Sequence, residues 1–245
     1  MKLMILTTVL ALSSVSMATE IDRNHFEIVE IKMTKLPASS KTTVLSARGE
    51  VGIGMVGGCE CTKVSSTKKP VDPQNLNPLD QVEMIVDQVI NIGKKIFSIV
   101  QAGKPVINVQ TDVATALPMG ARCWTDLQQW QMPQSELYKM AFINGWGSEV
   151  VTMSYRVLWL PGGTVDGVGQ YIGYATMTPE TIQVSWGFGL HANVSIPTVF
   201  NMGTRAAPLA GMQMTMGYRI ESPLTVVDQA QAFFVNGKGE FKQLQ

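Results

Sequence analysis

Charged residues are scarce in this chain of 245 residues, in which Asp, Glu, Lys and Arg together make up 16%. Basic and acidic residues are equal in number, 19 of each, and the basic ones form no polybasic segment. Proteins that bind nucleic acid normally carry a basic surface or a cluster of Lys and Arg. The composition therefore argues against a nucleic-acid partner.

Long apolar runs are missing beyond the N-terminus. Lys2 is followed by the short apolar stretch "LMILTTVLALSSV" and the small-residue site "SMA", which ends at Ala18. This pattern is typical of a cleaved signal peptide over residues 1–18, and it is shorter than the roughly 20 residues of a spanning helix. We expect an exported protein, periplasmic or extracellular, whose mature chain starts near Thr19.

Cysteine is limited to Cys59, Cys61 and Cys123. In an oxidising compartment, Cys123 is expected to form a disulfide with one of the other two, and three free thiols are the alternative. The three cysteines with His25 or His191 would supply zinc ligands. Structural zinc sites, however, usually have paired cysteines two to four residues apart, so we expect neither a metal nor a cofactor.

Catalytic signatures are also missing. The chain has two histidines and no "GxSxG" motif, and its acidic residues are scattered. His191 lies on the polar face of an alternating segment, where a histidine is more often hydrogen-bonded than catalytic. No catalytic residue is assigned, and an exported enzyme that uses His191 or the cysteines is the third-ranked hypothesis.

One long amphipathic helix is predicted over residues 77–103. Asn77 is a suitable N-cap, Pro78 suits the first turn, and Gly103 with the following Lys-Pro would end the helix. The apolar residues that recur at helical spacing are Leu79, Val82, Val86, Val89, Ile90, Ile96 and Val100. The apolar side of this helix would pack on a sheet.

The remaining segments predict strands. Residues 25–36 favour a strand, residues 41–56 predict a second strand that runs into glycines, and 19–70 as a whole would form an N-terminal β segment and loop. Further alternating segments separated by short turns indicate an antiparallel sheet over 104–245, namely 105–117, 136–144, 149–160, 168–177, 181–197, 210–222 and 224–235. We therefore expect one α+β, β-dominated domain over 19–245, with about seven to nine strands in a curved sheet packed against the helix.

The segment "TIQVSWGFGLHANVSIP", residues 181–197, alternates for longer than an ordinary strand of about five or six residues. Either Gly187 and Gly189 bend it sharply, or it is a single tall strand. Trp186 and Trp159 continue apolar faces, so we expect both in the core.

Candidate binding residues are aromatic or adaptable. Trp124, Trp130 and Trp146 lie near turns and are candidates for a carbohydrate-stacking or membrane-interface surface. His191, on the polar face of 181–197, is a further candidate contact residue. Met212, Met214 and Met216 alternate and could line an apolar cavity.

The leading functional hypothesis is an exported, non-catalytic envelope or secreted protein that acts as a structural or binding module. Its partner would be an envelope component or an apolar small molecule, and membrane association stays open. The alternating strands also fit an outer-membrane β-barrel protein, which is the second hypothesis.

Overall fold

The computed structural model describes residues 21–37, 90–101, 104–121 and 123–244. Strands account for 70% of these residues and helical segments for 4%. The helical segments are α1 (Arg23–Phe26) and the 3-10 helix η2 (Trp124–Asp126). The strands are β1 (Ile28–Leu36), β2 (Ile90–Gln101), β3 (Lys104–Ala116), β4 (Gln134–Asn144), β5 (Glu149–Val165), β6 (Val168–Val184), β7 (Gly189–Asn201), β8 (Ala210–Glu221), β9 (Val226–Asn236) and β10 (Phe241–Gln243). The expected α+β class is therefore wrong, because the described chain is almost all sheet.

The prediction of a long helix over 77–103 is wrong as well. Residues 90–101 form β2, which pairs antiparallel with β3 from Ile90↔Thr115 to Gln101↔Lys104. Ile90, Ile96 and Val100 are spaced by even numbers of residues, so they satisfy the alternation of a strand as well as helical spacing. The hydrogen-bonded pairing with β3 selects the strand over the helix. The first part of the predicted helix, 77–89, lies outside the described residues, as does most of the 19–70 segment.

Strand β3 joins two groups of strands into one sheet with the order β1-β4-β5-β6-β3-β7-β8-β9-β10, and β2 lies along the other edge of β3. Its first half pairs parallel with β7, from Ile107↔Leu190 to Thr111↔Val194. Its second half pairs antiparallel with β6, from Val113↔Thr176 to Ala116↔Ile172. The expected antiparallel pairing holds elsewhere in the sheet.

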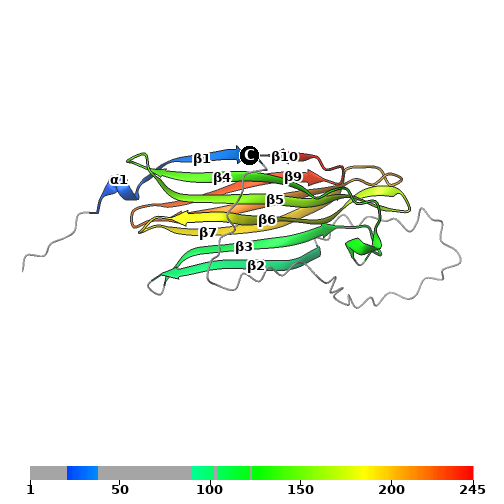
Figure 1. Cartoon of the computed structure of the whole chain (residues 1–245), viewed down its shortest axis with the longest axis horizontal. Helices are drawn as coiled ribbons and strands as arrows, with labels where there is room; N and C mark the ends of the chain where they lie inside the picture. Colours follow the sequence, from blue (N-terminus) through cyan, green and yellow to red (C-terminus); the bar gives the residue numbers. More distant parts are fainter. Residues whose placement is uncertain (1–20, 38–89, 102–103, 122, 245) are drawn as a thin grey trace, which may run out of the picture.

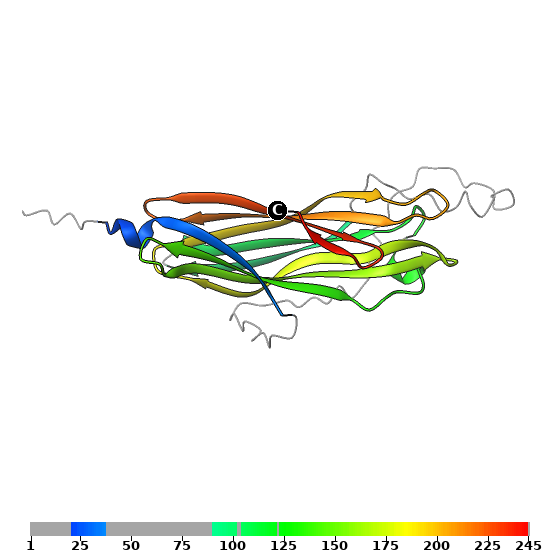
Figure 2. The ribbon, with the colours of Figure 1, turned by 90° about the horizontal axis from the view of Figure 1, so that it is seen from above.

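The sheet curls so that the two groups face each other as layers, as seen in Figure 2. Tyr138 on β4 lies 5.3 Å from Phe233 on β9, and Phe142 on β4 lies 5.4 Å from Tyr218 on β8, between ring centroids. These contacts between distant strands place the core inside the curl. Figure 1 shows the strands running along the long axis of the molecule, with α1 at one end.

The alternating segment 181–197 bends sharply rather than forming one tall strand. Strand β6 ends at Val184 and β7 begins at Gly189. In the turn between them the Phe188 amide donates to the Ser185 carbonyl over 3.1 Å, and Gly187 has φ +83°. Because of this turn, Trp186 does not lie on the face that points into the core. The expectation that Trp186 is a core residue is therefore wrong, whereas Trp159 is buried as expected.

Candidate functional site: a polar groove on the outer face of the sheet

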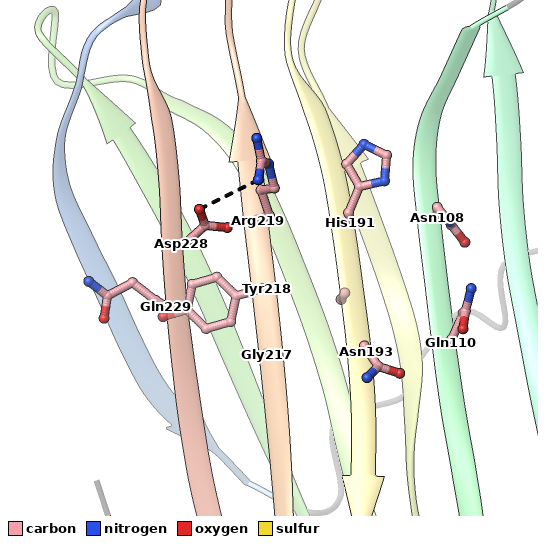
Figure 3. Close-up of a pocket in the computed structure, with 10 residues that line it drawn as sticks. Asn108, Gln110, His191, Asn193, Gly217, Tyr218, Arg219, Asp228 and Gln229 are labelled. Carbon is pink, nitrogen blue, oxygen red and sulfur yellow. Dashed lines mark ion pairs between the residues drawn. The ribbon is translucent and has the colours of Figure 1, made fainter.

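A row of polar side chains crosses four neighbouring strands on the outer face of the sheet. The pairings Asn108↔His191, His191↔Arg219 and Arg219↔Asp228 connect β3, β7, β8 and β9. Successive side chains of a strand point to opposite faces, and Leu190, the neighbour of His191, is fully buried in the core. The four polar residues of this row therefore face outward, as Figure 3 shows.

A second row lies beside the first and contains a gap. Gln110 pairs with Asn193, and Asn193 pairs with Gly217. A Cβ atom added at Gly217 would meet only the Asn193 carbonyl oxygen, at 4.0 Å. Gly217 thus lines an open hollow of about 360 Å³, within the usual range of small-ligand pockets. We call this hollow the groove, and it is lined by Asn108, Gln110, His191, Ala192, Asn193, Gly217, Tyr218, Arg219, Asp228 and Gln229.

Arg219, the one formal cation among the described residues that line the groove, forms ion pairs with two carboxylates. Its Nε donates to Glu221 Oε1 at 2.7 Å, and its Nη1 lies 3.7 Å from Asp228 Oδ2. The Nε2 of His191 lies 4.0 Å from Glu221 Oε2. All of these groups are well exposed, so each ion pair contributes at most about 1 kcal/mol to stability. Together Arg219, Glu221 and Asp228 carry a net charge of −1 beside the groove.

Four carboxamides face this hollow, on Asn108, Gln110, Asn193 and Gln229. No carboxamide hydrogen bond joins any of the four to another described residue. Each carboxamide has two donor hydrogens and an acceptor oxygen. These four side chains thus give the groove an uncharged part that can donate and accept hydrogen bonds at several adjacent points.

The residues that line the groove include no serine, threonine or cysteine. A histidine that activates a nucleophile needs a hydroxyl or thiol within hydrogen-bond reach, and His191 faces Glu221 and Arg219 instead.

Of the residues singled out in the sequence, His191 alone lies in the groove. Met212, Met214 and Met216 point the other way and are completely buried in the core, with at most 1% of each exposed. They line no part of the groove.

Trp130 and Trp124 come together at the end of the molecule away from α1. The indole Nε1 of Trp130 donates to the Trp124 carbonyl at 3.0 Å. The Trp130 ring lies so close over Gly163 that a Cβ there would approach the ring to 2.3 Å. Both contacts hold the partly buried Trp130 against the sheet, in a packing role.

Trp146 belongs to a chain of rings at the end that carries α1. His25 lies 5.3 Å from Trp146 and 4.6 Å from Phe26, and Phe26 lies 5.9 Å from Trp186. Phe188 packs against both His25 and Phe26. We call these five residues the aromatic end.

Cys123 is buried and disulfide-bonded. Cys59 and Cys61, its two predicted partners, lie outside the described residues, so the pairing stays a prediction. Among the described residues no group of three or more His, Cys, Asp or Glu side chains could hold a metal ion. Nor does that part of the chain contain a helix that is long and apolar enough to cross a membrane.

Most groove residues were not singled out from the sequence. The polar positions of 189–195 and 215–219 alternate with apolar ones, which was the available signal for Asn193 and Arg219. Asn108 and Gln110 join them only through the parallel β3–β7 pairing, which no local pattern indicates.

Comparison with protein-family models, curated proteins and solved structures finds no match.

Proposed function

We propose that this protein is an exported, non-catalytic binding module of the cell envelope or the secreted fraction. Its ligand is an uncharged, hydroxyl-rich molecule of the oligosaccharide class, held in the groove across β3, β7, β8 and β9. The observation that carries the proposal is the set of four carboxamides around the gap at Gly217, none of which has a hydrogen-bond partner among the described residues.

Hydroxyl groups of a saccharide both donate and accept hydrogen bonds, and a carboxamide can pair with them as acceptor and as donor. The net charge of −1 on Arg219, Glu221 and Asp228 favours an uncharged ligand over an anionic one. An apolar ligand fits less well, because the methionines expected to contact it are packed inside the core. The signal-like segment 1–18 and the disulfide at Cys123 support export.

The test is a titration of isotope-labelled protein with neutral hexasaccharides of the cellulose, chitin and maltose types. We expect at least one of them to shift the side-chain amide NMR signals of Asn108, Gln110, Asn193 and Gln229. Replacing Gly217 with Val fills the gap and suits a strand, so it should weaken binding at least about tenfold, a loss of about 1.4 kcal/mol, without destabilising the fold.

Thr215→Val is the matched control, since Thr215 is the preceding outward residue of β8 and does not line the groove. It should leave the affinity within about twofold, a difference of about 0.4 kcal/mol. The proposal is wrong if none of the hexasaccharides moves these signals, or if Gly217→Val binds as tightly as the unchanged protein.

A further inference from the structure

Two tryptophans project into solvent from neighbouring turns at the aromatic end. Trp146 lies in the β4–β5 turn and is 58% exposed, and Trp186 lies in the β6–β7 turn and is 81% exposed. The rings between them, Phe26 and Phe188, are buried and close this end of the core. Only the two outer rings of the cluster therefore face water with most of their surface.

Other apolar side chains are exposed at the same end. Ile21 precedes α1, Leu224 lies in the β8–β9 turn, and Val226 begins β9. The β8–β9 turn is joined to α1 because the Ser222 hydroxyl donates to the Phe26 carbonyl over 2.8 Å. Exposed apolar residues gathered on several turns at one end of a molecule mark an interaction surface.

The exposed aromatic area is small for a protein partner. With about 150–250 Å² for a whole aromatic side chain, the exposed parts of Trp146 and Trp186 offer roughly 200–350 Å². A standard protein interface needs about 800 Å² from each partner. A lipid bilayer has no such requirement, because an indole ring is stable in the headgroup region on its own, with its apolar body in the lipid and its N–H in a polar layer.

We propose that the aromatic end docks on the surface of a lipid bilayer, with Trp146 and Trp186 in the headgroup region. The charged residues next to the cluster, Asp22, Arg23 and Glu27 around α1, include both signs, so docking depends on the indoles rather than on anionic lipid. The strands run along the long axis away from this end, so docking through the turns would leave most of the sheet outside the bilayer.

The chain itself supplies a template for the test variant. Asn144-Gly-Trp-Gly and Asn236-Gly-Lys-Gly form the same turn, since in both the Asn Oδ1 accepts from the amides two and four residues later. Lys238 occupies the position of Trp146. Replacing Trp146 with Lys therefore keeps a side chain that this turn already accommodates.

The experiment measures binding of the full chain to large unilamellar vesicles by sedimentation. One set of vesicles is pure phosphatidylcholine, and the other contains phosphatidylethanolamine and phosphatidylglycerol at a ratio of 3:1. We expect binding to both sets, little changed by salt. The double variant Trp146→Lys/Trp186→Lys should lose at least about tenfold in partition, or about 1.4 kcal/mol. The control is Met132→Ser. Met132 lies near the other end and is 81% exposed, as is Trp186, so this variant should bind as the unchanged protein does.

A second measurement does not depend on any variant. Lipids brominated near the headgroup should quench part of the tryptophan fluorescence of the unchanged protein. The proposal is overturned if the unchanged protein neither sediments nor is quenched, or if Met132→Ser loses as much binding as the double variant. It is also overturned if the protein dimerises in solution and the double variant abolishes the dimer, because the aromatic end would then be an interface between two copies.

Discussion

The rings of Trp186 and Phe26 lie with their centroids 5.9 Å apart, although Trp186 is 81% exposed and Phe26 is 6% exposed. The contact joins the β6–β7 turn to α1, two segments about 160 residues apart in the chain. Phe26 closes the end of the core, and Trp186 lies on its outer side.

Gly187 is the position on which this contact depends. Its φ is +83°, and an added Cβ would lie 2.4 Å from Phe26 Cε1. Gly187→Ala should therefore lower the free energy of unfolding by about 3 kcal/mol, because the left-handed backbone costs 1–2 kcal/mol and the displaced ring adds to it.

The matched control is Gly147→Ala in the β4–β5 turn, where φ is +78° and nothing lies within 4 Å of an added Cβ. Only the backbone cost of about 1–2 kcal/mol should appear there. Urea denaturation of both variants measures the difference, and equal losses would mean that Phe26 does not limit the space at Gly187.

Asn144 makes three side-chain hydrogen bonds, one to α1 and two within the β4–β5 turn. Its Nδ2 donates to the His25 carbonyl at 3.1 Å, and its Oδ1 accepts from the amides of Trp146 and Ser148. Because Asn144 is buried, Asn144→Ala should cost about 2–3 kcal/mol of unfolding free energy. Asn144→Asp keeps both accepting bonds but places an oxygen against the His25 carbonyl oxygen, so in a thermal or urea unfolding experiment it isolates the bond to His25. If Asn144→Asp is as stable as the unchanged protein, the bond to His25 contributes nothing.

Much of the sheet could be predicted because its signal is local. The predicted strands over 105–117, 136–144, 149–160 and 210–222 correspond to β3, β4, β5 and β8, since apolar and polar residues alternate within each. The error over 90–101 has the same origin. Ile90, Ile96 and Val100 fit two periods, and the partner that selects the strand, β3, is not identified by spacing.

The groove was less accessible to prediction because it is assembled from pairings across the sheet. His191 could be placed on a polar face from its neighbours in the sequence. The hollow beside it needs Gly217 opposite Asn193 and the carboxamides of β3 in parallel register. The exposure of Trp186 depends on where the chain turns, and an uninterrupted alternation over 182–196 conceals that point.

Arg156 and Glu180 form an ion pair between β5 and β6 in which both side chains are mostly buried. The Nη1 of Arg156 also donates to the Ser135 hydroxyl at 3.2 Å. A double-mutant cycle with Arg156→Met and Glu180→Met should give a coupling free energy of about 1–2 kcal/mol. The exposed pair Lys139–Glu149, treated in the same way, should give less than about 1 kcal/mol. Similar coupling in the two pairs would mean that burial of the first adds nothing.

Two buried tyrosines should make the fold sensitive to alkaline pH. Burial raises the pKa of Tyr171 to about 12 and raises that of Tyr155 above its usual range. Each phenol stays protonated in the folded state but ionises near pH 10 in the unfolded chain. Its contribution to stability is therefore complete below pH 10 and is lost as pH rises towards the folded pKa, because unfolding then releases a proton.

Tyr171→Phe separates this effect from packing. The Tyr171 hydroxyl is buried and has no hydrogen-bond partner among the described residues, so its removal should leave the unfolding free energy at pH 7 unchanged or raise it by up to about 1 kcal/mol. Between pH 10 and 12 the variant should lose less stability than the unchanged protein, by up to about 2 kcal/mol.

Tyr155→Phe removes a hydroxyl that contacts Met33 Sδ at 3.2 Å, so it should cost about 1 kcal/mol at pH 7. It should also reduce the loss of unfolding free energy above pH 10. Urea unfolding at pH 7, 10 and 11.5 gives the pH dependence of the unfolding free energy for the unchanged protein and for the two variants. If Tyr171→Phe loses stability in parallel with the unchanged protein above pH 10, Tyr171 ionises without unfolding and its burial does not control the alkaline limit.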